Sequence, residues 1–320
     1  MAKTLSNTPV AAQLSLPILR YPRTPHLEGS RQQAGDAPDV QPLAPLAGHH
    51  AVIEEKMDGA NCAISFTEGG ELCLQSRGHY LLGGARERQF SALHPWARAH
   101  EAGLLACLQD RYVLYGEWMF AKHAVFYDRL PHYLLEFDVW DRMEQCFLST
   151  SRRHALLAGL PVVSVPVLYE GPMPQRADWL WSLVGHSLAR TPHWSEALDT
   201  TIERLALPHA LCRQQSDPSP LAEGLYVKLE DEHQVLARFK LVRADFVQHI
   251  LDSGSHHSER PIVPNGLAPG VDLYAPQLRC NWADLGAQCL YGLEALQAHH
   301  ANDAARVVRR ARKGGAPWRR

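Results

Sequence analysis

The sequence predicts an α+β fold built on antiparallel sheets. Strand-like runs dominate the chain between residues 52 and 242, several follow one another directly, and a glycine-containing turn joins two of them. Consecutive strands joined by short turns pair antiparallel, whereas a doubly wound fold alternates strands with helices. The order of the elements therefore favours α+β over a parallel, doubly wound sheet.

Length and composition place the chain among ordinary globular proteins. It has 320 residues, of which 46% are hydrophobic and 21% charged, enough to bury the core of one large domain or two moderate ones. The formal net charge is -2. Affinity for a polyanion would therefore have to come from local clusters of cations, because the whole molecule carries no positive field.

The strands are predicted from alternating or continuous apolar runs. After a proline-rich, irregular lead-in over residues 1–50, "NCAISF" (61–66) and "ELCLQS" (71–76) flank the turn "TEGG" and form a hairpin signal. A helix is expected over "STSRRHALLAGL" (149–160), which begins with cap residues and has Gly159 near its end. Further strand-like runs follow at 112–118, 133–140, 165–170, 224–230 and 234–242.

The chain changes character near residue 250, which divides a predicted domain 1–250 from a C-terminal segment 251–320. That segment begins as a loop by composition and continues with helical spacing. Its end is basic, with Asp303 as the opposing charge. The cations are Arg306, Arg309, Arg310, Arg312, Lys313, Arg319 and Arg320. A solvated helix end with a tail and a nucleic-acid contact are equally consistent with this composition.

Neither disulfides nor a zinc site are indicated. The cysteines number seven, and no two form a C-x-x-C pair. The 18 histidines show no H-E-x-x-H spacing, so surface histidines are expected. No signal-peptide core and no run of 18 apolar residues occurs. We expect a reduced, cytoplasmic enzyme or binding protein without a membrane contact.

A recurring set of lysines, arginines and carboxylates lies at the ends of the strand-like runs. Together they suit a nucleoside triphosphate with a divalent metal, because carboxylates hold the metal, cations hold phosphates and a lysine can act as a nucleophile. No G-x-x-x-x-G-K-[ST] loop is present, so side chains would have to hold the phosphates. The positions are Lys56, Asp58, Ser76, Arg77, Glu117, Asp138, Glu223, Lys228, Arg238 and Lys240.

These residues carry a resemblance to a known family. "EKMDGAN" (55–61) resembles the K-x-D-G nucleophile motif of the covalent nucleotidyltransferases, which include ATP-dependent RNA ligases, DNA ligases and mRNA capping enzymes. The family's later motifs follow in order, and "GEWMFAKHAVFYDRLPHYLLEFDVWD" is most similar to the RNA ligase branch. Those motifs are "SRG", "YGEW", "LLEFDVWD", "EGLYVK" and "ARFKLVR". The resemblance covers about residues 20 to 250.

The resemblance implies a nucleotidyltransferase domain of the ATP-grasp-like adenylation type, followed by a small helical segment. Two features depart from the best-known members. The last motif has Arg238 where lysine is usual, and arginine does not replace a flexible ammonium. The segment after residue 250 does not read as the five-stranded OB domain of DNA ligases and capping enzymes.

The resemblance assigns the catalytic and metal-binding roles. Lys56 would attack the α-phosphorus of ATP and carry AMP, Lys240 would bind the α-phosphate, and Glu223 would hold Mg2+ or Mn2+. Asp138 is a weaker metal candidate. An ordinary lysine has a pKa of about 10.4, so the site is expected to lower the pKa of Lys56, with Lys240 and the metal disfavouring its ammonium.

The remaining positions would bind the nucleotide. Asp58 would orient the lysine or the ribose, Arg77 would contact ribose or phosphate, and Phe137 would stack on adenine. Gly59 would allow a tight backbone turn beside the nucleotide. The other members of this predicted set are Glu55, Glu117 on the ribose hydroxyls, and Lys228 and Arg238 on phosphates.

The resemblance implies an ATP-dependent RNA ligase for repair or processing of RNA. It would pass AMP from the lysine to an RNA 5'-phosphate and then join that end to a 3'-hydroxyl. A separate end-healing kinase or phosphatase is an expected partner, because the chain shows no motif of either. A DNA ligase or capping enzyme is the nearest alternative, and a non-catalytic nucleic-acid-binding protein is an alternative of another class.

Overall fold

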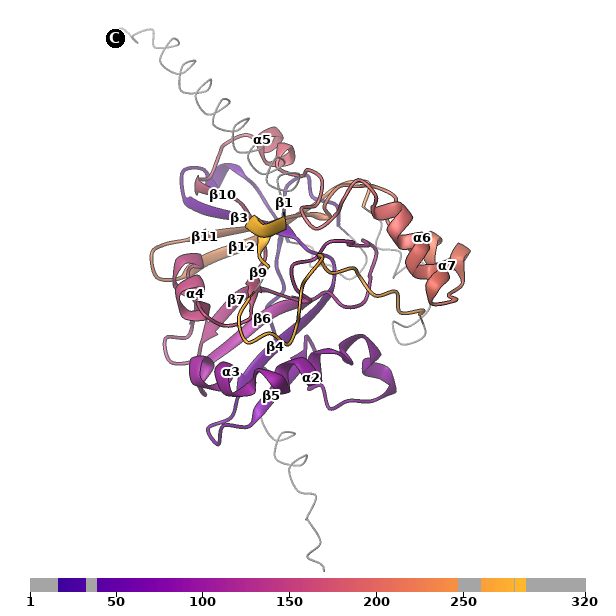
Figure 1. Ribbon diagram of the computed structural model, residues 1–320. Coiled ribbons are helices and arrows are strands. Elements are labelled where there is room, and N and C mark those ends of the chain that lie inside the picture. The colour runs from indigo at the N-terminus through magenta and orange to yellow at the C-terminus, as the bar shows by residue number, and fades with distance from the viewer. Residues whose placement is uncertain (1–16, 33–38, 247–259, 279, 286–320) are drawn as a thin grey trace, which may run out of the picture.

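The computed structural model describes residues 17–32, 39–246, 260–278 and 280–285 (Figure 1). Two sheets of six strands each form the centre of the molecule, and helices are few and short. Most strand pairs are antiparallel. The predicted α+β class with antiparallel sheets is therefore confirmed. No helix within the described ranges has the length and apolarity needed to cross a membrane.

The first sheet, called sheet A, has the strand order β10, β3, β11, β12, β1, β2. The short strands β1 and β2 pair in parallel, and β1 also runs parallel to β12. The predicted irregular lead-in thus contributes two strands to the edge of this sheet. The bounds are β1 His26–Leu27, β2 Val40–Gln41, β3 His50–Lys56, β10 Val167–Pro172, β11 Gly224–Glu230 and β12 Val235–Val242.

The second sheet, sheet B, has the order β5, β4, β6, β7, β8, and β9 pairs in parallel with β7. The predicted hairpin is present, with Gly70 at a φ of +79° in the turn between β4 and β5, a conformation that favours glycine. The bounds are β4 Ala60–Phe66, β5 Leu72–Ser76, β6 Tyr112–Trp118, β7 Leu134–Asp141, β8 Cys146–Phe147 and β9 Val163–Ser164.

The helices lie around the two sheets (Figure 1). The helix expected at residues 149–160 is present as α4, and Ser149 is its N-cap, accepting a hydrogen bond from the backbone N–H of Arg152. The α-helices are α2 Leu93–Ala99, α3 Glu101–Leu108, α4 Thr150–Leu157, α5 Ala177–Ser182, α6 Trp194–Arg204 and α7 His209–Gln214. Three 3-10 helices are also described: η1 Ala44–Leu46, η2 Ala85–Phe90 and η4 Trp282–Leu285.

Each sheet buries its outer face against helices. Trp96 of α2 packs near Trp118 of β6, with ring centroids 6.5 Å apart, and both are almost fully buried. On the outer face of sheet A, Ile53 and Leu225 share a core cluster with Leu180 of α5. Burial of such side chains stabilises each layer by about 1.5–3 kcal/mol per large residue. The inner faces of the two sheets then face one another.

Residues 260–278 return to the body of the protein. Asn265 accepts a hydrogen bond from the backbone N–H of Tyr127, donates one to the backbone oxygen of Met119, and is almost fully buried. The segment therefore packs on the loop between β6 and β7. The predicted boundary at residue 250 falls in 247–259, outside the described residues, as do the predicted helical spacing beyond residue 286 and the basic tail. The division of the chain at residue 250 stays a prediction.

Candidate active site

A cavity of about 590 Å³ opens between the inner faces of the two sheets. It receives residues from β3, β4, β7, β11 and β12 and from the loops that join them. Many of the residues singled out in the sequence lie in its lining. These are Glu55, Lys56, Asp58, Gly59, Ser76, Arg77, Glu117, Phe137, Glu223 and Lys240.

Lys56 is placed by strand pairing. It is the last residue of β3, and its Cα pairs with Gly224 at the start of β11, so Glu223 lies directly beside it. The Lys56 Nζ donates a hydrogen bond to Glu223 Oε2 at 2.8 Å. Position 224 must be glycine, because a Cβ there would lie 1.9 Å from the backbone oxygen of Leu241. This close approach of β11 to β12 also fixes where Glu223 sits.

At the opposite wall of the cavity, Gly59 allows its own backbone to lie close to Trp118 and Met119. A Cβ at this position would lie 2.7 Å from Met119 Sδ and 2.9 Å from the backbone oxygen of Trp118. Its N–H donates to Glu117 Oε1 at 3.1 Å. The glycine thus lets β4 pair tightly with β6 and leaves the Glu117 side chain turned toward Lys56.

The carboxylates keep Lys56 charged in the free protein. Burial disfavours its ammonium, but Glu223, Glu117 and Asp58 together outweigh burial and raise its pKa. Burial also raises the pKa of Glu223 and that of Glu117 to about 7, against the lowering effect of Lys56. The expectation that the site lowers the pKa of Lys56 is therefore wrong for the protein without ligands, because the negative charges outnumber the nearby cations.

Asp58 acts on the protein backbone. Its Oδ2 accepts hydrogen bonds from the backbone N–H groups of Ala124 and Val125, each at 2.7 Å. Its own N–H donates to the hydroxyl of Tyr127 at 2.9 Å. Charge-assisted bonds of this kind are about twice as strong as neutral ones. Asp58 therefore anchors the loop between β6 and β7 beside Lys56, which is compatible with the prediction that it orients the lysine.

The remaining cavity residues surround Lys56 at different depths. Lys240 and Phe137 are half-buried, whereas Arg77 lies exposed at the rim. The Phe137 ring packs against Tyr21 with centroids 5.1 Å apart. Glu55 differs, because strand alternation turns its side chain to the other face of β3, where its carboxylate accepts the N–H of Leu188. Its predicted nucleotide role would have to be carried by its backbone.

Three predicted ligand-binding residues lie outside the cavity lining. Lys228 pairs with Asp138 at 3.3 Å and also with Glu54, and both Lys228 and Asp138 are fully buried. Arg238 pairs with Asp138 at 3.4 Å, and its guanidinium lies 3.7 Å from the ring centroid of Phe147. The structure therefore does not bring these three to the cavity, because opposite charges between the sheets already hold them.

These residues belong to a buried ion-pair cluster centred on Arg153 of α4. Its guanidinium pairs with Glu54 of β3 and with Glu136 of β7, and none of the three side chains is exposed. The cluster joins both sheets to α4. The sequence did not identify Arg153, because helical spacing alone does not tell it from its partly exposed neighbour Arg152.

Other cavity residues were also missed. Tyr21 comes from the lead-in and donates a hydrogen bond to Asp138, while Tyr226 of β11 meets the Tyr21 hydroxyl at 2.6 Å. His123 lines the cavity from the loop after β6, and Arg86 lines it from η2. Residue type and spacing gave no signal for Arg86 and His123, because these segments reach the site only through tertiary packing.

Carboxylates of the cavity could hold a divalent cation together with substrate phosphates, although they do not form a complete set of protein ligands. Within the described ranges, no group of three or more His, Cys, Asp or Glu side chains is arranged to hold a metal ion. Glu223 and Glu117 nevertheless carry raised pKa values beside the cavity, and a cation would relieve the cost of their burial. Mg2+ and similar ions are typically held by one or two carboxylates plus substrate phosphates, and these two residues suit that arrangement.

Comparison with known proteins gives one family match. A family model described as RNA ligase matches residues 49–242, a span that begins just before β3 and ends with β12. A search of curated proteins returned no match. Lys56, Glu223 and Lys240 thus all lie inside the matched span.

Solved structures of an RNA ligase from Naegleria gruberi are also similar. A mutant of that ligase with ATP and Mn is 18% identical over 62% of this chain and 52% of that chain, with a TM-score of 0.42. The same ligase with PPi is 17% identical over 74% of this chain and 64% of that chain, with a TM-score of 0.45. This chain thus spans about half the length of the first of these structures.

Proposed function

Because this chain belongs to the RNA ligase family, we propose that it joins RNA ends with ATP, through AMP attached covalently to Lys56. Family membership confirms the resemblance drawn from the sequence motifs. The ends to be joined are a 5'-phosphate and a 3'-hydroxyl. The observation that carries the proposal is the position of Lys56, which ends a strand in a large cavity beside Glu223.

In the first step the Lys56 nitrogen attacks the α-phosphorus of ATP. A nitrogen–phosphorus bond forms, the bond to the bridging oxygen breaks, and pyrophosphate leaves. The ammonium must first lose a proton to solvent, and positive charge from the cation and from Lys240 would favour this loss, because Glu223, the hydrogen-bonded partner of Lys56, would then be engaged by the cation. A divalent cation, Mg2+ or Mn2+, would be held by Glu223 and Glu117 and supply positive charge beside the phosphates.

The cavity walls bind the nucleotide. Lys240 reaches the α-phosphate from β12, Arg77 contacts ribose or phosphate at the rim, and Phe137 offers its half-buried ring to adenine. Glu117 serves the ribose hydroxyls or the cation. Because Asp58 holds the loop after β6 by two charge-assisted bonds, the walls are fixed before the nucleotide binds.

The next two steps transfer AMP and close the strand. An oxygen of the RNA 5'-phosphate attacks the phosphorus of lysyl-AMP, and Lys56 leaves and regains a proton. The RNA 3'-hydroxyl, which loses its proton, then attacks the 5'-phosphorus and displaces AMP. These steps depend on positioning and on neutralising phosphate charge, for which Lys240 and Arg77 are available. A separate end-healing enzyme would supply the required ends for RNA repair or processing.

The first test isolates the later steps from the first. We expect Lys56→Ala to lose AMP labelling but still to join an RNA strand that already carries AMP on its 5' end, without ATP. The remaining residues act on AMP and phosphate and not on the lysine. Failure of the variant on that substrate, with wild-type joining intact, would contradict a role of Lys56 in the first step alone.

The second test separates the RNA ligase from the DNA ligase alternative. Wild-type protein is given nicked or single-stranded substrates of RNA and of DNA, with ATP and Mg2+ or Mn2+. We expect efficient joining only of RNA, since the 2'-hydroxyls distinguish the two. Equal joining of all-DNA strands would contradict the RNA assignment.

A further inference from the structure

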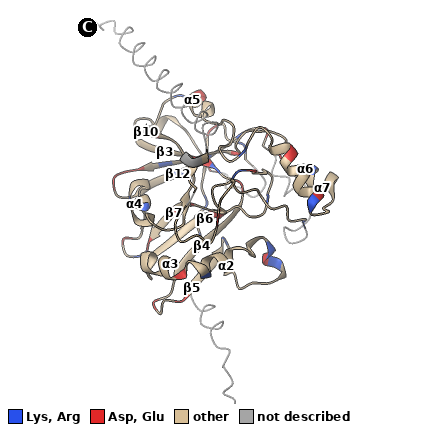
Figure 2. Cartoon of the chain, viewed as in Figure 1, with Lys and Arg blue, Asp and Glu red and all other residues tan. Residues whose placement is uncertain are grey.

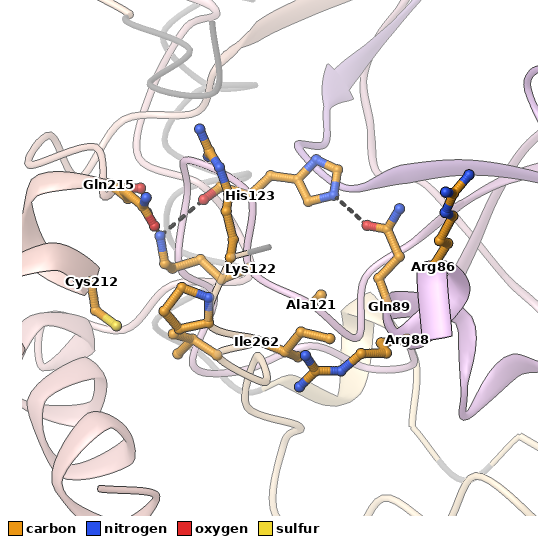
Figure 3. A pocket seen from close by; sticks show the side chains of 12 residues that line it. Arg86, Arg88, Gln89, Ala121, Lys122, His123, Cys212, Gln215 and Ile262 are labelled. Carbon is orange, nitrogen blue, oxygen red and sulfur yellow. Dashed lines mark hydrogen bonds between the residues drawn. The ribbon is translucent and has the colours of Figure 1, made fainter. Parts of the chain in front are cut away.

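A second, smaller pocket lies beside the nucleotide cavity and is lined by cations (Figure 3). It measures about 40 Å³, too little for a base and ribose but of the size scale of a single phosphate group. Its cations come from three separate segments. They are Arg86 and Arg88 of η2, Lys122 of the loop after β6, and Arg260 of the segment 260–278. We refer to it as the basic pocket.

Few negative charges lie next to the cations of the basic pocket. No aspartate or glutamate is among its lining residues, and among the described residues Arg86 and Arg88 form no ion pair within 4 Å, although both are exposed. Figure 2 shows basic positions in blue on the loop that precedes α2. Arg86 and Arg88, which have no ion-pair partner within the described part of the chain, line a concave site whose lining has no carboxylate, and such a site favours an anion.

The Lys122 ammonium is held at the pocket by two hydrogen bonds to the backbone. Its Nζ donates hydrogen bonds to the backbone oxygens of Gln215 and His123, at 2.7 and 2.9 Å. These carbonyls orient the ammonium without neutralising it. Burial lowers the pKa of Lys122 to about 8, and the nearby Asp58 opposes this only in part. An anion in the pocket would therefore compensate for the cost of burying this charge.

The basic pocket adjoins the nucleotide cavity. Arg86, Gln89 and His123 line both, and His123 Nε2 lies 3.1 Å from Gln89 Oε1, a contact drawn as a dashed line in Figure 3. A strand whose end lies at Lys56 would therefore have a neighbouring phosphate close to the basic pocket. The nucleotide cavity already has Lys240 and Arg77 for the phosphates of ATP. The cations of the basic pocket suit a further phosphate.

We propose that the basic pocket binds a backbone phosphate of the RNA strand, next to the end that reacts at Lys56. This inference rests on the proposed function, because it takes RNA as the substrate of the neighbouring cavity. The contact is electrostatic and independent of base identity, since phosphate contacts position a strand without reading its sequence. It fixes the strand so that its end lies at the nucleotide.

The test measures salt-dependent binding of a short 5'-phosphorylated RNA to variants at Arg88, which lines the basic pocket alone. Loss of one phosphate contact lowers the slope of log affinity against log salt by about 0.7 for a single strand. We expect Arg88→Ala to lower the slope by about this amount and to weaken binding several-fold at low salt. Arg88→Lys, which keeps the charge, should retain most of the slope.

Arg204→Ala is the matched control. Arg204 ends α6, is exposed, and lines neither cavity, so its loss changes net charge equally without touching the pocket. We expect its slope to equal that of wild type. The proposal would be overturned if Arg88→Ala had the same salt slope as wild type. It would also be overturned if Arg88→Ala and Arg204→Ala lowered the slope by the same amount.

Two further measurements on the same preparations tell whether the phosphate bound in the pocket belongs to RNA or to ATP. They also distinguish failure of the pocket inference from failure of the proposed function. Joining of RNA that already carries AMP should fall in Arg88→Ala by a larger factor than self-labelling with ATP. An equal fall in both would assign the pocket to ATP and overturn the RNA inference. Absence of self-labelling in wild type would contradict the proposed function. The salt dependence of RNA binding would in that case still test whether the basic pocket binds a phosphate.

Discussion

Two clusters of charged residues occupy the same inner face of sheet A, yet their surroundings differ. At the open end, Lys56 and Glu223 face a cavity of about 590 Å³. Further along the same strands, Glu54 and Lys228 lie in the buried ion-pair cluster with Arg153, where none of the three side chains is exposed.

The difference shows what separates a charge that holds the fold from one that can bind a ligand. In the buried cluster each acid meets a cation from another layer, so α4 and both sheets are joined. In the cavity, Glu223 and Glu117 share Lys56 and keep raised pKa values of about 7. Because Lys56 only partly balances the negative charge of these two carboxylates, they can still bind a cation, and the cation in turn can bind phosphates.

The largest expected effect on stability comes from breaking the buried cluster. Arg153→Met leaves Glu54 and Glu136 buried without their main partner, and loss of one member of a buried pair costs about 3–5 kcal/mol. Chemical denaturation followed by circular dichroism measures the loss. Arg152→Met is the control on the preceding residue, since the Arg152 guanidinium lies nearer the surface, where it pairs with Glu144 and donates to the backbone oxygen of His233. Equal effects of the two variants would contradict a structural role of the cluster.

A smaller, pH-dependent effect is expected at Glu55. Burial raises its pKa to about 7 from 4.5, so the folded protein binds more protons than the unfolded chain between these pH values. The free energy of unfolding therefore falls as pH rises through this window. Glu55→Gln removes the dependence and should gain stability relative to wild type by about 3 kcal/mol between pH 4.5 and 8.

Denaturation at a series of pH values checks this, with the exposed Glu68→Gln as control. Parallel pH profiles of Glu55→Gln and wild type would show that Glu55 is compensated like the acids of the buried cluster.

The smallest effect on stability is expected at the open end. Glu223→Gln keeps the shape of the side chain and leaves Lys56 beside a cavity. Near pH ~5, where the pKa of about 7 keeps the Glu223 carboxyl protonated in the folded protein, the free energy of unfolding should therefore change by under about 1 kcal/mol. AMP labelling should nevertheless fall by about a hundredfold or more, because metal and proton contacts are lost. Labelling at the wild-type rate would remove Glu223 from the proposed mechanism.

The strands and the position of Lys56 could be predicted because their signals are local. The runs at 112–118 and 224–230 agree with β6 and β11 in full, and Lys56 follows from a short motif at a strand end. The short strands β1 and β2 lack such a signal, since their two residues each gain order only by pairing with sheet A.

The depth of each charged residue could not be predicted. Lys228 and Lys240 are of one type and lie on adjacent strands of sheet A, but α4 covers one and the cavity exposes the other. Arg86, Arg88 and Lys122 likewise come together only because η2 and the loop after β6 pack side by side. Spacing along the chain carries no information on either contact.

The most direct measurement of the central claim is the position of AMP on the protein. Wild-type protein is incubated with ATP and Mg2+ or Mn2+, digested, and analysed by mass spectrometry. We expect added AMP on the peptide that contains Lys56, with release of pyrophosphate in equal amount, and none in Lys56→Ala. AMP on another residue, or undiminished labelling of Lys56→Ala, would contradict the assignment of Lys56 as the nucleophile.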